Sequence, residues 1–178
     1  MRLHRRAPDA STASRRSARA LGAVLAAAVV AATIAAGAAI GAATSSPLSL
    51  HGTNVLTGQP VGLAAYAGKP VIVNLWSSSC GACFADARAL AAFERTHPAA
   101  RVLGVDVTDT AASARSLYRR AGWRHPSIAD PHGRIAAQLR LQTLPTTLSL
   151  DAKHQVVQRI NGQTTAAGFG AAYRKAST

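Results

Sequence analysis

The stretch VIVNLWSSSCGAC, at positions 71–83, decides the fold of this chain. Its first six residues are mostly apolar and β-branched, which predicts a buried strand. Three serines end that strand, and the only two cysteines of the sequence, Cys80 and Cys83, follow them. The next segment is rich in Ala and Leu at helical spacing. The order predicts a Cys-x-x-Cys pair at the N-terminus of a helix that directly follows a strand.

This position suits a redox-active dithiol. The nucleophile in disulfide exchange is the thiolate, and an isolated cysteine has a pKa of about 8.5. The unpaired N–H groups and the dipole of a helix N-terminus favour the anion and lower that pKa. We therefore expect Cys80 to attack and Cys83, one turn later and more buried, to resolve the mixed disulfide. Gly81 and Ala82 keep the turn small enough for the ring to close.

Two other uses of the cysteines fit the pattern less well. A structural zinc site wants four ligands, and the sequence has no second cysteine pair. A purely structural disulfide across two residues closes too small a loop to stabilise the fold much. No metal site is predicted.

Composition limits the remaining classes of function. The chain has 178 residues, 48% of them hydrophobic, which suits one ordinary domain with a short extension. Its net charge of +13 invites a nucleic-acid hypothesis. Only 4% of the residues are aromatic, and no basic patch is interleaved with aromatic residues, so we expect no nucleic-acid partner.

The N-terminal part predicts export. Residues 1–19 form an Arg-rich cytoplasmic segment, and residues 20–43 form an uncharged apolar run long enough to span a bilayer. We favour an uncleaved transmembrane anchor, although the small residues at 41–43 also suit a signal peptidase. Residues 44–50 are a linker and residues 51–178 a folded domain. The domain would face the outside of a cell membrane, tethered by a single pass, or be secreted if the segment is cleaved.

The exported part predicts an α/β fold with a mixed sheet covered by helices on both faces. Gly and Pro residues punctuate it into short elements. Strands are expected at 53–56 and 61–63 (a hairpin), 71–76, 101–107, 146–150 and 156–160, and helices at 80–96, 110–121, 134–141 and 164–175.

Four arginines cluster on and just after the helix predicted at 110–121. They are Arg115, Arg119, Arg120 and Arg124. We interpret the cluster as a solvated helix face in preference to a patch that docks a partner.

The strand, the Cys-x-x-Cys pair and the later sequence Leu144-Pro145-Thr146-Thr147 together resemble the thioredoxin superfamily. The chain is most similar to the TlpA/ResA-like branch of extracytoplasmic thiol-disulfide oxidoreductases, from about residue 48 to the C-terminus. The resemblance implies a thioredoxin-like domain with an N-terminal β-hairpin extension and an N-terminal transmembrane helix. It implies no cofactor other than the redox-active disulfide Cys80–Cys83.

The resemblance also implies where a substrate would bind. Pro145 would be a cis-proline beside the dithiol, and the backbone of Leu144 would pair with an extended substrate segment. The substrate-binding residues expected in this way are Trp76, Gly81, Ala82, Leu144 and Pro145.

One acid is a candidate proton relay. Asp86 follows Cys83 by three residues, where the family often has a glutamate, and it could serve Cys83 if burial raises its pKa. A first-turn Asp favoured by the helix dipole explains it equally well. Asn74 stands where conventional thioredoxins carry a buried Asp. The chain departs from the family at Ser79, where a Trp is common, and at Ala82, where a Pro is usual.

Three classes of function could use this cysteine motif. The first is an oxidoreductase that exchanges disulfides with extracytoplasmic protein thiols, either as a reductant supplied by a membrane thiol donor, as in cytochrome c maturation, or as an oxidant served by a membrane thiol acceptor. The second is a Cu(I) metallochaperone, because soft thiolates suit that ion. The third, a peroxidase, is set aside, because Val73 and Ser77 occupy the positions where it needs Pro and Thr.

Overall fold

The strand expected at 71–76 lies at the centre of the sheet. In the computed structural model, which describes residues 46–178, this strand is β3. The elements are β1 (His51–Thr53), β2 (Pro60–Gly62), the 3-10 helix η2 (Leu63–Tyr66), β3 (Val71–Trp76), α2 (Gly81–Thr96), β4 (Arg101–Val107), α3 (Ala111–Ala121), β5 (Ser127–Asp130), α4 (Arg134–Gln138), β6 (Thr146–Leu150), β7 (Val156–Asn161) and α5 (Ala166–Ala176).

The main sheet has the strand order β5-β4-β3-β6-β7. The β3–β4 and β4–β5 pairs are parallel, and the β3–β6 and β6–β7 pairs are antiparallel. All six residues of β3 are buried, because the strand has a neighbour on each side and helices or the hairpin on each face. The mixed sheet expected from the sequence is confirmed, and it is thioredoxin-like.

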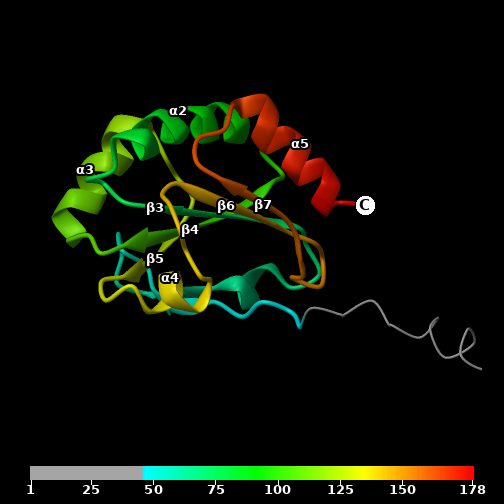
Figure 1. Cartoon of the computed structure of the whole chain (residues 1–178), viewed down its shortest axis with the longest axis horizontal. Helices are drawn as coiled ribbons and strands as arrows, with labels where there is room; N and C mark the ends of the chain where they lie inside the picture. Colours follow the sequence, from blue (N-terminus) through cyan, green and yellow to red (C-terminus); the bar gives the residue numbers. More distant parts are fainter. Residues whose placement is uncertain (1–45) are drawn as a thin grey trace, which may run out of the picture. The chain divides into compact units, whose positions relative to one another are not determined.

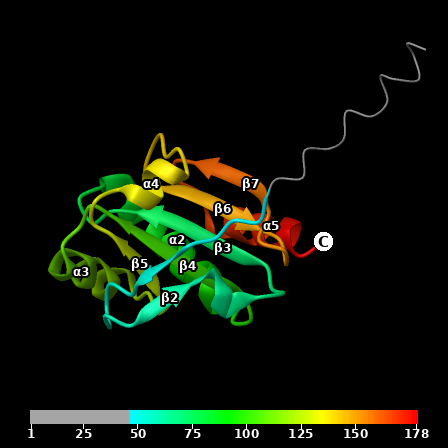
Figure 2. The same ribbon diagram turned by 90° about the horizontal axis from the view of Figure 1, so that it is seen from below.

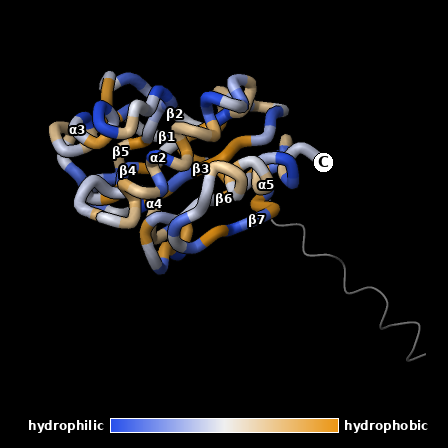
Figure 3. The backbone as a smooth tube through the Cα atoms, turned by 90° about the horizontal axis from the view of Figure 1, so that it is seen from above, coloured by the Kyte–Doolittle hydropathy of each residue, from blue (hydrophilic) through white to orange (hydrophobic). Residues whose placement is uncertain are grey.

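Each face of the sheet is covered by its own layer. Helices α2, α3 and α5 lie on one face, above the sheet in Figure 1, and α4 lies on the other. One core cluster joins β3 to α2, α3 and α5, and a second joins the other face of the strands to α4 and to the segment around Leu50 and Leu63. Figure 3 shows hydrophobic residues along β3 and hydrophilic ones on the outer turns of α3.

The ends of α3 follow from local chemistry. The Thr110 side chain accepts a hydrogen bond from the Ser113 N–H, which satisfies a free donor of the first turn. Gly122 ends the helix with a φ of 71°, a left-handed conformation that glycine adopts without steric cost.

The sequence did not predict β5, and it placed the two hairpin strands at residues that differ from the observed ones. β1 and β2 pair antiparallel, so the hairpin is confirmed, but its strands are His51–Thr53 and Pro60–Gly62. Val55, placed in the first strand from sequence, instead donates its N–H to the carbonyl of Ser127 in β5. β5 has only four residues and a proline directly before it, so it shows no alternation long enough to recognise.

The expected membrane anchor, residues 20–43, lies outside the described residues, as do residues 1–19 and the first part of the linker. From residue 46 onward, the chain has no helix that is both long and apolar enough to cross a membrane.

Candidate active site

The cysteine pair lies where the sequence places it. Cys80 is the N-cap of α2, and it is joined to Cys83 by a disulfide with the Cα atoms 5.2 Å apart. The backbone N–H of Cys83 donates to the Cys80 sulfur at 3.1 Å. In the reduced protein the same N–H would face a thiolate, and the dipole of the 16-residue α2 would add to its stabilisation.

Solvent exposure assigns different roles to the two sulfurs. Cys83 is 1% exposed, whereas Cys80 is only half-buried. Its neighbours Ser79, Gly81 and Ala82 are exposed. A substrate sulfur can therefore approach Cys80 and is kept from Cys83, as the sequence predicts for a nucleophile and a resolving cysteine.

Two loops from the other half of the sheet lie at the end that carries the dithiol. The Leu144–Pro145 peptide bond is cis, the conformation that the family resemblance implies. Pro145 directly precedes Thr146, which pairs with Leu75, so it lies at the same end of the sheet as the Cys-x-x-Cys motif. In the loop after β7, the side chain of Gln163 donates to the Ala82 carbonyl at 3.1 Å.

Asp86 is buried one turn beyond Cys83. Its oxygens accept hydrogen bonds from the Asn74 amide at 3.1 Å and from the Thr164 N–H at 2.8 Å. Burial raises the pKa of Asp86 above its ordinary value, and these two hydrogen bonds limit the rise. Asn74 also donates to the Thr147 hydroxyl at 3.1 Å, which ties α2 to β3 and β6. The condition set for Asp86 as a proton relay, a pKa raised by burial, is met.

Asp109 is a site residue that sequence reasoning missed. It lies between β4 and α3, and its carboxylate accepts from the Ser78 N–H, from the Ser78 hydroxyl at 2.8 Å and from the Ser77 hydroxyl at 3.1 Å. The loop that leads to Cys80 is therefore held by this single carboxylate. The serine run was the available signal, because three successive hydroxyls after a buried strand need acceptors.

The expectation that Trp76 contacts a substrate is wrong. Its side chain is 0% exposed and lies edge-on to Tyr118 and Trp123, at centroid distances of 5.7 and 5.3 Å. Its indole N–H donates to the Ser127 hydroxyl at 3.1 Å. Because β3 is buried on both faces, its last side chain enters the core beneath α2 and α3.

Asp106, at the end of β4, is a second buried acid. It is 1% exposed, pairs in register with Trp76, and neither carboxylate oxygen has a hydrogen-bond partner. Burial raises the pKa of Asp106 to about 8, and the neighbouring carboxylates of Asp109 and Asp130 contribute to the rise.

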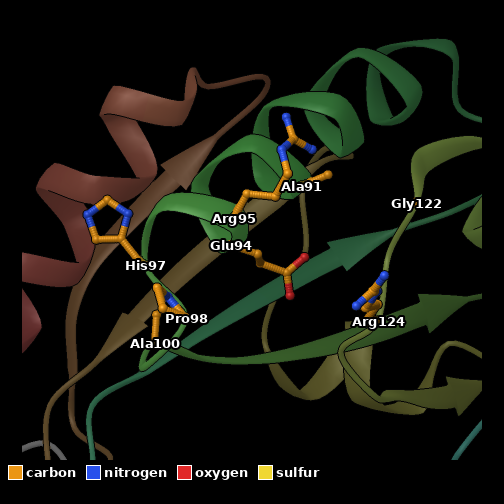
Figure 4. Close-up of a pocket in the computed structure, with 8 residues that line it drawn as sticks. All are labelled: Ala91, Glu94, Arg95, His97, Pro98, Ala100, Gly122 and Arg124. Carbon is orange, nitrogen blue, oxygen red and sulfur yellow. The ribbon is translucent and has the colours of Figure 1, made fainter.

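The hollow in Figure 4 lies far from the dithiol. It has a volume of about 480 Å³ and lies where α2 ends, with Glu94 and Arg95 on that helix and Arg124 across from them. A helix of 16 residues is about 24 Å long, so this hollow is at the opposite end of α2 from Cys80. It has no part in the cysteine chemistry.

A family comparison agrees with this geometry. The model of the AhpC/TSA family matches residues 47–159. The chain belongs to the AhpC/TSA family. Membership brings the thioredoxin fold, which the sheet order and the Cys-x-x-Cys helix already display.

Two curated relatives and one crystal structure are similar to this chain over most of the described residues. The chain is 27% identical over 115 residues to the thiol-disulfide oxidoreductase ResA of Geobacillus kaustophilus, and 23% identical over 115 residues to that of Bacillus thuringiensis subsp. konkukian. Each match covers 62% of this chain and 64–65% of the relative, so the chain spans a little under two thirds of their length. A DsbF homologue from Corynebacterium diphtheriae superposes with a TM-score of 0.67 at 27% identity, over 73% of this chain and 85% of that one.

Among the described residues, 46–178, no group of three or more His, Cys, Asp or Glu side chains is placed to hold a metal ion.

Proposed function

We propose that this protein is a thiol-disulfide oxidoreductase that exchanges the Cys80–Cys83 disulfide with protein substrates outside the cytoplasm. The observation that carries the proposal is the asymmetry of the pair. The accessible sulfur, on Cys80, receives the N–H of a helix N-terminus, while the second sulfur, on Cys83, is buried. An attacking thiolate and a shielded resolving thiol need this arrangement.

The exchange balances in both directions. In reduction, the Cys80 thiolate attacks a substrate disulfide, forms a mixed disulfide and releases one substrate thiolate. The Cys83 thiolate then attacks the Cys80 sulfur, which closes the Cys80–Cys83 disulfide and releases the second substrate thiolate. Two electrons pass to the substrate. Oxidation of a substrate dithiol runs the same steps in reverse.

Asp86 would serve the second step. Cys83 must lose its proton before it attacks, and it is buried beneath the tip of α2. A carboxylate on the next turn whose pKa is raised by burial accepts a proton more readily than an ordinary carboxylate does. Asn74 and Thr164 hold that carboxyl in place through their hydrogen bonds.

The substrate would lie over Gly81 and Ala82 and along Leu144. Gly81 and Ala82 are exposed beside the accessible sulfur, and Leu144 is half-buried against the same core cluster as Cys80. An extended segment paired with the backbone before Pro145 would present its sulfur to Cys80.

Location and electron flow complete the proposal. The apolar run at 20–43, with arginines before it, supports a membrane anchor and an extracytoplasmic domain. A reductant in such a place needs a membrane thiol donor, and cytochrome c maturation is a role of that kind; an oxidant needs a membrane thiol acceptor.

Trapping the mixed disulfide tests the proposal. Cys83→Ser should hold a substrate on Cys80 as a stable adduct visible by mass spectrometry, and Cys80→Ser should hold none. The wild-type chain should reduce a peptide disulfide with turnover when dithiothreitol is supplied. Absence of adduct and turnover, with one Cu(I) retained per chain, would support the metallochaperone instead.

A further inference from the structure

The fully exposed charged residues of the domain are all cationic. Every Asp and Glu from residue 46 onward is buried or half-buried, whereas every Lys and Arg in that range except Arg101 is exposed. The acids are used internally, for example by Asp86 and Asp109 in the active site. The exposed face of the protein is therefore cationic and attracts anionic partners.

One group of arginines lies on α3 and on the first part of α2. We define the α3 arginine surface as Arg88, Arg115, Arg119 and Arg120, all of them exposed. Two of these arginines lie over the ring of Phe84, the residue after Cys83. Arg88 is 4.8 Å and Arg120 is 5.0 Å from the ring centroid. These cation–π contacts hold the guanidinium groups next to the motif.

An apolar groove runs along the same surface. A hollow of about 390 Å³ has Leu56 and Trp123 in its lining, with Arg115 and Arg119 among the surrounding residues. A second hollow, of about 500 Å³, shares Leu56 and Arg115 with the first and reaches Asp109. We call the two together the Leu56 groove. In Figure 2 the segment that leads into β2 runs near the helix α3, and both contribute residues to the groove.

The groove leads to the attacking cysteine. Asp109, at its far end, holds Ser77 and Ser78, which directly precede Ser79 and Cys80. A chain lying in the groove would therefore end at the loop that carries the nucleophile.

We propose that the α3 arginine surface and the Leu56 groove dock an acidic polypeptide segment of the substrate, with an apolar side chain of that segment between Leu56 and Trp123. This inference rests on the proposed function. Arginine guanidinium groups bind carboxylates through paired hydrogen bonds, and the exposed guanidinium groups of this surface can reach such a partner. Opposite charge would also raise the rate of encounter with Cys80. The arginine cluster, interpreted from sequence as a solvated face, thus acquires a function.

A protein segment fits these observations better than an anionic lipid surface. A bilayer is broad and needs only positive charge, which the whole domain offers. A concave apolar groove that reaches Asp109, the residue that holds Ser77 and Ser78 ahead of Cys80, suits an extended chain that must deliver a sulfur atom.

The test compares two disulfide peptides of equal length with the full-length protein in neutral detergent. Both carry one Leu, and the residues flanking the disulfide are Asp and Glu in one peptide and Asn and Gln in the other. The proteins are wild type, the triple variant Arg115→Gln/Arg119→Gln/Arg120→Gln, and the control Lys153→Gln/Arg174→Gln/Lys175→Gln. The control removes the same charge near the opposite end of the sheet, where Leu150 pairs with Val71.

We expect the wild type to reduce the acidic peptide with a kcat/KM about 10-fold above that for the neutral peptide at low salt, falling toward equality at roughly 0.5 M salt. The triple variant should lose this preference and keep its rate on the neutral peptide. The control should retain the preference.

Three results would overturn the inference. Equal rates for both peptides with the wild type would show that the surface does not prefer acidic segments. Equal losses in the two triple variants would show a general charge effect without a docking site. Equal peptide rates, together with binding to phosphatidylglycerol vesicles that only the α3 variant loses, would assign the surface to a membrane. If neither peptide reacted at all, the proposed function itself would be refuted.

Discussion

Replacing Asp106 by Asn should stabilise the protein, and the gain should grow with pH. Asp106 is buried at the end of β4 without a hydrogen-bond partner, and burial beside two other carboxylates raises its pKa from 3.8 to about 8. The folded chain therefore keeps the proton over a range in which the unfolded chain releases it. The stability that protonated Asp106 contributes is therefore fully present below about pH 4 and is lost progressively as the pH rises to about 8.

The size of the effect follows from the shift. One pKa unit corresponds to about 1.4 kcal/mol, so the complete loss between pH 4 and 8 is about 6 kcal/mol, of which about 4 kcal/mol is lost by pH 7. Asn has the shape of a protonated Asp and does not ionise. Asp106→Asn should therefore match the wild type near pH 4 and exceed it by about 4 kcal/mol at pH 7.

Urea unfolding of the oxidised protein between pH 4 and 8 measures this difference. The control is Asp151→Asn, in the turn after β6, where the carboxylate accepts the N–H groups of Lys153 and Gln155 at 2.9 and 2.8 Å. That control should change stability by at most about 1 kcal/mol. A constant difference between Asp106→Asn and the wild type at every pH, or a loss of stability at pH 7, would refute the reasoning.

Three further substitutions test other parts of the site. Asp86→Asn should slow the step that needs Cys83 by roughly 10²-fold and remove one ionisation from its pH–rate profile, because Asn cannot accept the proton; an unchanged profile in stopped-flow exchange would exclude the relay. Asp109→Ala removes the acceptor of the Ser77 and Ser78 hydroxyls and should cost about 2 kcal/mol of stability and slow attack by Cys80. Asp109→Asn should recover part of both losses, as measured by urea unfolding and peptide turnover. An Asp109→Ala protein equal to wild type in both assays would show that Asp109 does not hold the loop before Cys80. Gly104→Ala should cost about 1–3 kcal/mol, because its new Cβ would meet the Ser127 side chain and the Trp76 indole; Ser127→Ala added to it should relieve only the contact with the hydroxyl and recover part of the loss, and unfolding curves that show no cost for Gly104→Ala would contradict the packing.

Local sequence is enough to predict the central strands and the dithiol. β3, β4 and β6 begin and end at the residues expected, because each is a short run rich in apolar or β-branched residues with breakers beside it, such as the serines after Trp76. The N-cap of α3 can also be predicted from the sequence, since Thr110 directly precedes an amphipathic run. The spacing of the two cysteines, together with the strand ahead of them, is sufficient to place the nucleophile at a helix start.

The remaining features depend on contacts between segments distant in sequence. β5 exists because its residues pair with β4, with Ser127 opposite Gly104, and four residues carry no pattern of their own. Asp109 reaches Ser78 across 31 positions of the chain. The burial of Trp76 follows from the helices above β3, which a motif comparison does not include.

The reduction potential of the Cys80–Cys83 pair tests the central claim most directly. The full-length protein would be equilibrated against glutathione and dithiothreitol buffers, and its free thiols would be alkylated and counted by mass spectrometry. We expect a single two-electron transition between about −120 and −270 mV, the range of thioredoxin-fold oxidoreductases, with a value near −270 mV indicating a reductant and one near −120 mV an oxidant. A pair that stays oxidised or stays reduced across all buffers would contradict this expectation.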